Sequence, residues 1–134
     1  MNSTYCCLMV ALDHIPSNHF LLEIARDEIT IAVKCASEYE LTWHSIIWIR
    51  SNIRTKRRIR EQLNHLAFDC YTHLLEAVDY LNQYADLMNE QSYRPAKWWD
   101  EVSCSLYLAY ISINTENKRE ISTRQLRLFE INSP

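Results

Sequence analysis

The clearest pattern along the chain is a helical seam between residues 63 and 88. Its apolar side chains recur every three or four residues: Leu63, Leu66, Cys70, Leu74, Ala77, Leu81, Tyr84 and Met88. This spacing keeps one side chain per turn on the same face, so it predicts a long helix packed against other helices. No glycine or proline interrupts residues 42–90, and one rod or two helices could occupy them. A break at residues 51–55 is favoured, because two antiparallel helices bury more apolar surface.

Helical spacing recurs in three further segments. From about residue 17 to residue 39 the apolar positions are Leu21, Ile24, Ala25, Ala32 and Ala36, preceded by the capping candidates Ser17 and Asn18. A second helix is expected from Thr42, with an inner side made of Trp43, Ile46, Ile47 and Ile53. Pro95 suits the first turn of the last helix. The apolar stripe of that helix is Trp99, Val102, Leu106, Ala109 and Ile113.

Together these segments predict an all-α protein, an antiparallel four-helix bundle with a short N-terminal segment and an extended C-terminal tail. The N-terminal segment is the apolar stretch 5–12, which ends in a turn at 13–16. The polar stretch 114–120 is expected to act as a linker. The expected division is therefore a bundle domain at residues 1–113, then a linker and tail at 114–134.

Composition supports helices and narrows the function classes. The chain has 134 residues and no glycine, whereas average usage would give roughly nine. Glycine supplies the positive φ of hairpin turns and the backbone of phosphate-binding loops, so its absence argues against a multi-hairpin β fold and against a glycine-rich phosphate-binding loop. We expect no cofactor.

The cysteines and the N-terminal stretch indicate in which cellular compartment the protein is expected. The five cysteines have neither CxxC nor zinc-ligand spacing, which favours reduced thiols over a disulfide framework. Cys35, Cys70 and Cys104 fall on apolar faces, where burial makes a thiol inert. No basic residue precedes Arg26, and no apolar run reaches transmembrane length. We expect a cytoplasmic protein without a signal peptide or a membrane partner.

Basic residues are concentrated in one short stretch, although the net charge is −3. Six of the 14 lie in residues 50–60, here called the basic segment: Arg50, Arg54, Lys56, Arg57, Arg58 and Arg60. No acidic residue lies between Glu40 and Glu61. Such a cluster can contact DNA or RNA phosphates, or it can be a solvated helix end balanced by acidic neighbours. Few aromatic residues are interleaved with it, which argues against base stacking.

Arg60 and His65 have the Arg-x4-His spacing within this region. The pair resembles the motif of HEPN-domain ribonucleases, in which the arginine and histidine of two protomers meet and assist RNA cleavage. That resemblance implies catalytic roles for Arg60 and His65 in a dimer. The chain departs from the pattern in having Glu61 after the arginine, where asparagine is common, and in placing the motif early in the third helix.

Glu61, His65, Asp69 and His73 follow one another at four-residue intervals. Side chains of these types at this spacing can share a metal ion. Successive positions nevertheless drift by about 40° around a helix, so the four cannot all face one ion. We therefore expect no metal, and interpret both histidines as surface residues beside the seam.

The tail contains Gln125, Leu126, Arg127, Leu128 and Phe129. This stretch resembles the bacterial DNA sliding-clamp-binding motif, usually Q-L-(Ser/Asp)-L-F, which binds the clamp as an extended peptide. The resemblance implies that Gln125 hydrogen-bonds in one subsite, that Leu128 and Phe129 fill an apolar pocket, and that Leu126 packs at its edge. Arg127 departs from the consensus at a position that tends to face outward.

The clamp resemblance leads to the favoured hypothesis, a small non-enzymatic accessory protein of DNA replication, DNA repair or a mobile element. Its tail would bind the DNA sliding clamp, and its body would engage DNA, RNA or another factor through the basic segment. Two alternatives stay open. One is a HEPN-like ribonuclease toxin that uses Arg60 and His65, and the other is a structural helical adaptor or homo-oligomer subunit.

Overall fold

The protein is all-α in the part that the structure describes. The computed structural model describes residues 1–45, 50–90 and 97–117. Its helices are α1 (Asn2–His14), α2 (Phe20–Trp43), α4 (Ile53–Glu90) and α5 (Lys97–Asn117). These described ranges contain no strand, which confirms that the protein is all-α there. None of these helices combines the length and the apolar character needed to cross a membrane.

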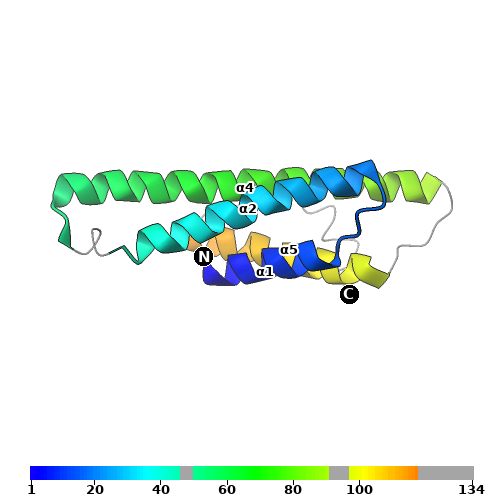
Figure 1. Cartoon of the computed structure of the whole chain (residues 1–134), viewed down its shortest axis with the longest axis horizontal. Coiled ribbons are helices and arrows are strands. Elements are labelled where there is room, and N and C mark those ends of the chain that lie inside the picture. The colour runs from blue at the N-terminus through cyan, green and yellow to red at the C-terminus, as the bar shows by residue number, and fades with distance from the viewer. Residues whose placement is uncertain (46–49, 91–96, 118–134) are drawn as a thin grey trace.

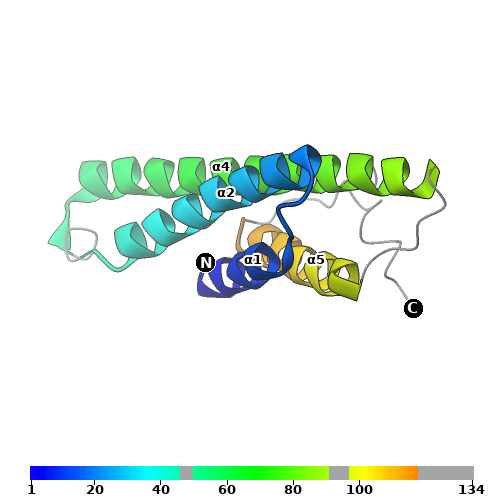
Figure 2. The same cartoon turned by 45° about the vertical axis from the view of Figure 1, so that its right-hand side comes forward.

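The helices form a bundle of two layers (Figures 1 and 2). In one layer α2 runs back along α4, and in the other α1 lies beside α5. With 38 residues, α4 is about 57 Å long at 1.5 Å per residue. It is therefore longer than either helix of the second layer, and its first turns extend beyond α1 and α5 (Figure 1). The N-terminal end of α4 is consequently left open to solvent on that side.

The predicted seam of α4 supplies one wall of the core. Its buried members are Leu63, Leu66, Cys70, Leu74, Ala77 and Leu81, whereas Tyr84 and Met88 are half-buried. The other helices meet this wall with fully buried side chains: Leu8 of α1, Leu22 and Ile29 of α2, and Leu106, Tyr110 and Ile113 of α5. The helical periodicity therefore identified the buried face of α4 correctly.

The predicted second helix does not begin at Thr42, and two of the four residues of its predicted inner side, Trp43 and Ile53, are exposed. Thr42 and Trp43 are the last residues of α2, and α4 begins only at Ile53. Trp43 is 46% exposed and Ile53 is 81% exposed. Both lie toward the end of the α2–α4 layer that α1 and α5 do not cover (Figure 1). Ile46 and Ile47 lie outside the described residues.

The predicted break at residues 51–55 coincides with the start of α4. The side-chain Oδ1 of Asn52 accepts a hydrogen bond from the backbone N–H of Thr55 at 2.9 Å. An asparagine in this position satisfies one of the backbone donors that a helix start leaves unpaired. The local polar residues thus set where the long helix begins.

The short N-terminal segment is itself a helix, the 13-residue α1. The guanidinium Nη1 of Arg26 donates to the carbonyl oxygens of Leu12 and Ile15, at 2.6 Å and 2.5 Å, and so satisfies acceptors at the end of α1.

The predicted caps Ser17 and Asn18 are not the ones used at the start of α2. His19 accepts from the N–H of Leu21 at 3.1 Å instead.

Helix α5 extends past the predicted domain boundary at residue 113. Asn114 is buried, and its Nδ2 donates to the carbonyl oxygen of Tyr110 at 2.8 Å. The first four residues of the predicted linker, 114–117, are therefore helical. Pro95 and the tail 118–134 lie outside the described residues.

Candidate nucleic-acid interface

The basic segment lies at the open end of the α2–α4 layer. Arg50 is exposed ahead of α4, and the first two turns of α4 carry the other five basic residues. Four of these are exposed and one, Lys56, is half-buried: Arg54, Lys56, Arg57, Arg58 and Arg60. The structure thus places all six candidate residues at or just before the N-terminal end of α4.

The direction of these side chains follows from the helix geometry. At about 100° per residue, Arg54, Arg57 and Arg58 lie on the side of α4 opposite Leu63 and the rest of the seam. Neither α1 nor α5 reaches this end of α4 (Figure 1). The three arginines therefore form an outward-facing positive surface.

The charge distribution of the chain is strongly asymmetric. The basic segment holds six of the 14 basic residues and none of the 17 acidic ones, so the remaining residues carry a net charge of −9. The first turn of α4 also contains no acidic residue, although the N-terminal end of a helix has a partial positive charge. Both effects raise the local potential, which favours an anionic partner at this end.

Arg60 and His65 are exposed on the same helix but do not face the same way. Their separation of five residues corresponds to a rotation of about 140° around α4. His65 lies near the carboxylate of Asp69 instead, with 3.4 Å between its Nε2 and Oδ2. Within one chain the structure therefore does not bring this pair together.

The residues at four-residue intervals on α4, Glu61 to His73, do not form one cluster. His65 pairs with Asp69 on the surface, whereas the Nδ1 of His73 donates to the Oε2 of Glu28 on α2 at 2.5 Å. Glu61 is exposed. Among residues 1–45, 50–90 and 97–117, no group of three or more His, Cys, Asp or Glu side chains could hold a metal ion.

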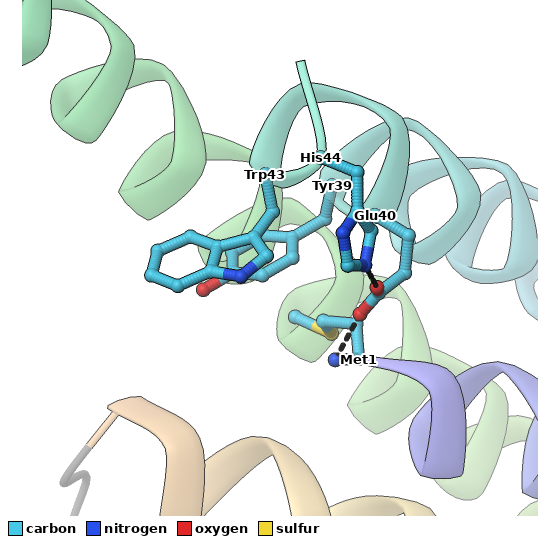
Figure 3. A pocket seen from close by; sticks show the side chains of 5 residues that line it. All are labelled: Met1, Tyr39, Glu40, Trp43 and His44. Atoms are coloured by element: carbon cyan, nitrogen blue, oxygen red, sulfur yellow. Dashed lines mark hydrogen bonds and ion pairs between the residues drawn. The ribbon is translucent and has the colours of Figure 1, made fainter. Parts of the chain in front are cut away.

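A pocket that the sequence interpretation missed lies at the C-terminal end of α2 (Figure 3). It has a volume of about 300 Å³ and is lined by Met1, Tyr39, Glu40, Trp43 and His44. We call it the aromatic pocket. Three of its lining residues belong to α2 and His44 follows the helix directly. They form two pairs spaced by four, Tyr39 with Trp43 and Glu40 with His44, so the members of each pair lie one turn apart. This four-residue spacing is visible in the sequence and could have identified the pocket.

The carboxylate of Glu40 makes two polar contacts at the aromatic pocket. It pairs with the α-amino group of Met1 and accepts a hydrogen bond from the Nε2 of His44 at 3.1 Å. Burial by itself would raise the pKa of Glu40, but the hydrogen bonds and positive charge of the Met1 amine and His44 outweigh it and lower the pKa. The carboxylate is therefore ionised at neutral pH, and the Met1 amine compensates its charge.

The tail residues proposed to contact a clamp, Gln125, Leu126, Leu128 and Phe129, lie outside the described residues. No protein-family model, curated protein or solved structure matches the chain. The function must therefore be argued from the chemistry of its own residues.

Proposed function

We propose that this chain is a small non-enzymatic accessory protein of DNA replication, DNA repair or a mobile element. Its body is an antiparallel helical bundle that binds nucleic acid through the basic segment. Its tail binds the DNA sliding clamp through Gln125, Leu126, Leu128 and Phe129. The two contacts have different roles, because the tail selects the clamp and the basic segment holds the body on the nucleic acid beside it.

The observation that supports nucleic-acid binding is the concentration of six basic residues in a stretch of sequence, 41–60, that contains no acidic residue. Arg54, Arg57 and Arg58 face outward on a helix end that the second layer leaves open. Phosphate contacts by such residues release condensed counterions, which makes binding favourable and strongly dependent on salt. The net charge of −9 over the rest of the chain opposes binding through other surfaces and so orients the protein on a polyanion.

Binding of nucleic acid is tested by fluorescence anisotropy with a labelled DNA duplex between about 50 and 200 mM salt. The Arg54→Ala/Arg58→Ala variant should bind more weakly, and its plot of log K against log salt should be shallower by about two. Lys97→Ala removes an exposed cation from the start of α5 and is the matched control. Equal salt slopes for the wild type and the double variant would contradict the proposal.

Clamp binding is tested separately with the full chain and purified bacterial sliding clamp. The tail hypothesis predicts saturable binding that is lost in the Leu128→Ala/Phe129→Ala variant, because these two side chains would fill the apolar pocket of the clamp. Arg127→Ser, which restores the usual consensus residue, should preserve or strengthen binding. If the Leu128/Phe129 variant bound as tightly as the wild type, the tail would not be the clamp-binding element.

A further inference from the structure

The outward side of the α1–α5 layer is apolar and carries no charge over most of its length. Residues 2–12 and 102–115 contain no Asp, Glu, Lys, Arg or His, although Asp, Glu, Lys and Arg make up 23% of the chain. Large apolar side chains are nevertheless exposed there, with Val10 at 43% and Leu108 at 50%. Exposed apolar surface that is depleted of charge is typical of the core of a protein–protein interface.

Two contacts between α1 and α5 define how the helices align. The hydroxyl of Thr4 donates to the hydroxyl of Ser112 at 2.8 Å, and the Nε2 of His14 pairs with the Oε2 of Glu101 at 3.2 Å. Position 4 is thus level with 112 and position 14 with 101, which is an antiparallel register. Because both helices rise equally per residue, Leu108 is about level with residue 7.

The exposed side chains of the two helices form one surface. Cys6 and Val10 on α1, like Cys104 and Leu108 on α5, are four positions apart and so share a face of their helix. All four are exposed, and the half-buried Cys7 lies beside them. Burial raises the pKa of the Cys7 thiol, and the thiols of Cys6 and Cys104 raise it further, so thiols from both helices lie close together. We call these five residues the uncharged face.

The size of the uncharged face suits a weak interface. The uncharged stretches are about 17 Å long on α1 and about 21 Å long on α5. With about 10 Å of width for each helix, they cover about 400 Å² on one chain. Two such faces in contact would bury about 800 Å², which is the size of a weak, concentration-dependent contact. The ion pair between His14 and Glu101 lies at one end, where it would belong to a polar rim.

A second copy of the chain is the partner that matches this chemistry. Nucleic acid and anionic membrane surfaces attract Lys and Arg side chains, and residues 2–12 and 102–115 contain none. Two copies of the uncharged face can meet without repulsion between like charges, even though the whole chain has a net charge of −3. The second copy would also bring a two-helix layer, the same kind of surface that α2 and α4 place against the inner side of α1 and α5 (Figure 2).

We propose that two copies of this chain pair through the uncharged face, with one α1–α5 layer packed against the other around a two-fold axis. The four helices at the contact then form a bundle of their own. Arg54, Arg57 and Arg58 point away from the seam of α4, and therefore away from this layer, so the dimer leaves both basic segments accessible. The inference goes beyond the proposed function and does not depend on nucleic-acid or clamp binding.

The test is sedimentation velocity of the full chain between about 5 and 500 µM, with a reductant present to exclude disulfides between exposed cysteines. The average mass should rise from that of one chain toward that of two. Leu108→Glu should raise the dimer Kd by at least about tenfold, because pairing would bury its carboxylate without a partner. Leu41→Glu makes the same change at a position of α2 that is 72% exposed and should leave the dimer Kd unchanged. Circular dichroism checks that both variants stay helical.

Thiol protection gives a second readout that needs no variant. In dilute protein, where the monomer dominates, a brief iodoacetamide pulse should label Cys6 and Cys104. At about 500 µM their labelling relative to Cys35, which lies on α2, should fall in proportion to the dimer fraction. The Leu108→Glu variant should not show this fall.

Three results would overturn the inference. A chain that stays monomeric at the highest concentration does not pair with itself. A dimer that is insensitive to Leu108→Glu and leaves Cys6 and Cys104 equally labelled uses a different surface. If the chain stays monomeric but floats with phosphatidylcholine vesicles, the uncharged face takes a lipid surface. None of these results affects the anisotropy tests of nucleic-acid and clamp binding, so the proposed function is judged separately.

Discussion

The imidazole of His73 on α4 donates to the carboxylate of Glu28 on α2, with 2.5 Å between Nδ1 and Oε2. The two residues are 45 positions apart in the chain. Both side chains are at most 30% exposed, so solvent screens their interaction less than it screens a surface pair. The contact joins two helices at one level, and a shift of α2 along α4 by one turn would break it.

Replacing His73 with alanine should lower the free energy of unfolding by about 1–2 kcal/mol, because the half-buried Glu28 carboxylate loses its partner. Urea unfolding followed by circular dichroism measures the change. His65→Ala is the matched control, since His65 is 76% exposed and its contact with Asp69 lies on the surface. That change should cost less than about 0.5 kcal/mol. Equal losses in the two variants would show that the α2–α4 contact contributes little.

Truncation of Leu74 tests the seam of α4. This side chain is fully buried, so Leu74→Ala should destabilise the fold by about 2–5 kcal/mol through lost burial and the cavity that remains. Leu41→Ala makes the same chemical change at an exposed position and should alter stability by less than about 0.5 kcal/mol. Thermal unfolding separates the two outcomes. A small effect at Leu74 would mean that the core is less closely packed than the structure indicates.

Stability should fall at acid pH partly because of Glu40. The pKa of this carboxyl is lowered in the folded chain from its ordinary value of 4.5, so folding favours the ionised form. The resulting stability is fully present above about pH 4.5 and is lost as the pH falls through the lower pKa of the folded state. In Glu40→Gln the decline below pH 4.5 should therefore be shallower, as measured by urea unfolding at several pH values. Parallel declines in the two proteins would assign the acid sensitivity to other groups.

Thiol reactivity should separate the cysteines by their surroundings. Burial raises the pKa of Cys7, with smaller contributions from Cys6 and Cys104, and burial likewise raises the pKa of Cys35. The reactive thiolate is therefore scarce at both positions near pH 8. Cys6 and Cys104 are exposed, so a brief iodoacetamide pulse read by mass spectrometry should label them first. Preferential labelling of Cys35 would contradict this order.

The exposure of Cys104 also corrects the sequence interpretation, which placed it on a buried face. Helical periodicity predicts burial well for residues at the centre of an apolar stripe but poorly for residues at its edges. On α5 the stripe through Val102, Leu106 and Ala109 is buried, whereas Cys104 lies outside it. A residue at the margin is buried only if a neighbouring helix covers it, and its own segment does not contain that information.

The same limit explains the error at residues 42–53. Trp43 and Ile53 are apolar and have helical spacing relative to their neighbours, so they appeared to be core positions. They are exposed because α4 and α2 continue past the end of α1 and α5. How far one helix extends beyond another depends on the lengths of both and on how they pair.

The sequence by itself determined the helical class, the buried face of α4 between Leu63 and Leu81, and the concentration of positive charge in the basic segment. These are local properties, because periodicity, capping and charge are read from residues within a few turns of one another. Only the tertiary structure decided that His73 contacts Glu28 and that the amine of Met1 pairs with Glu40. Both relationships depend on how two helices align over their whole length, and the many side-chain contacts along the interface determine that alignment together.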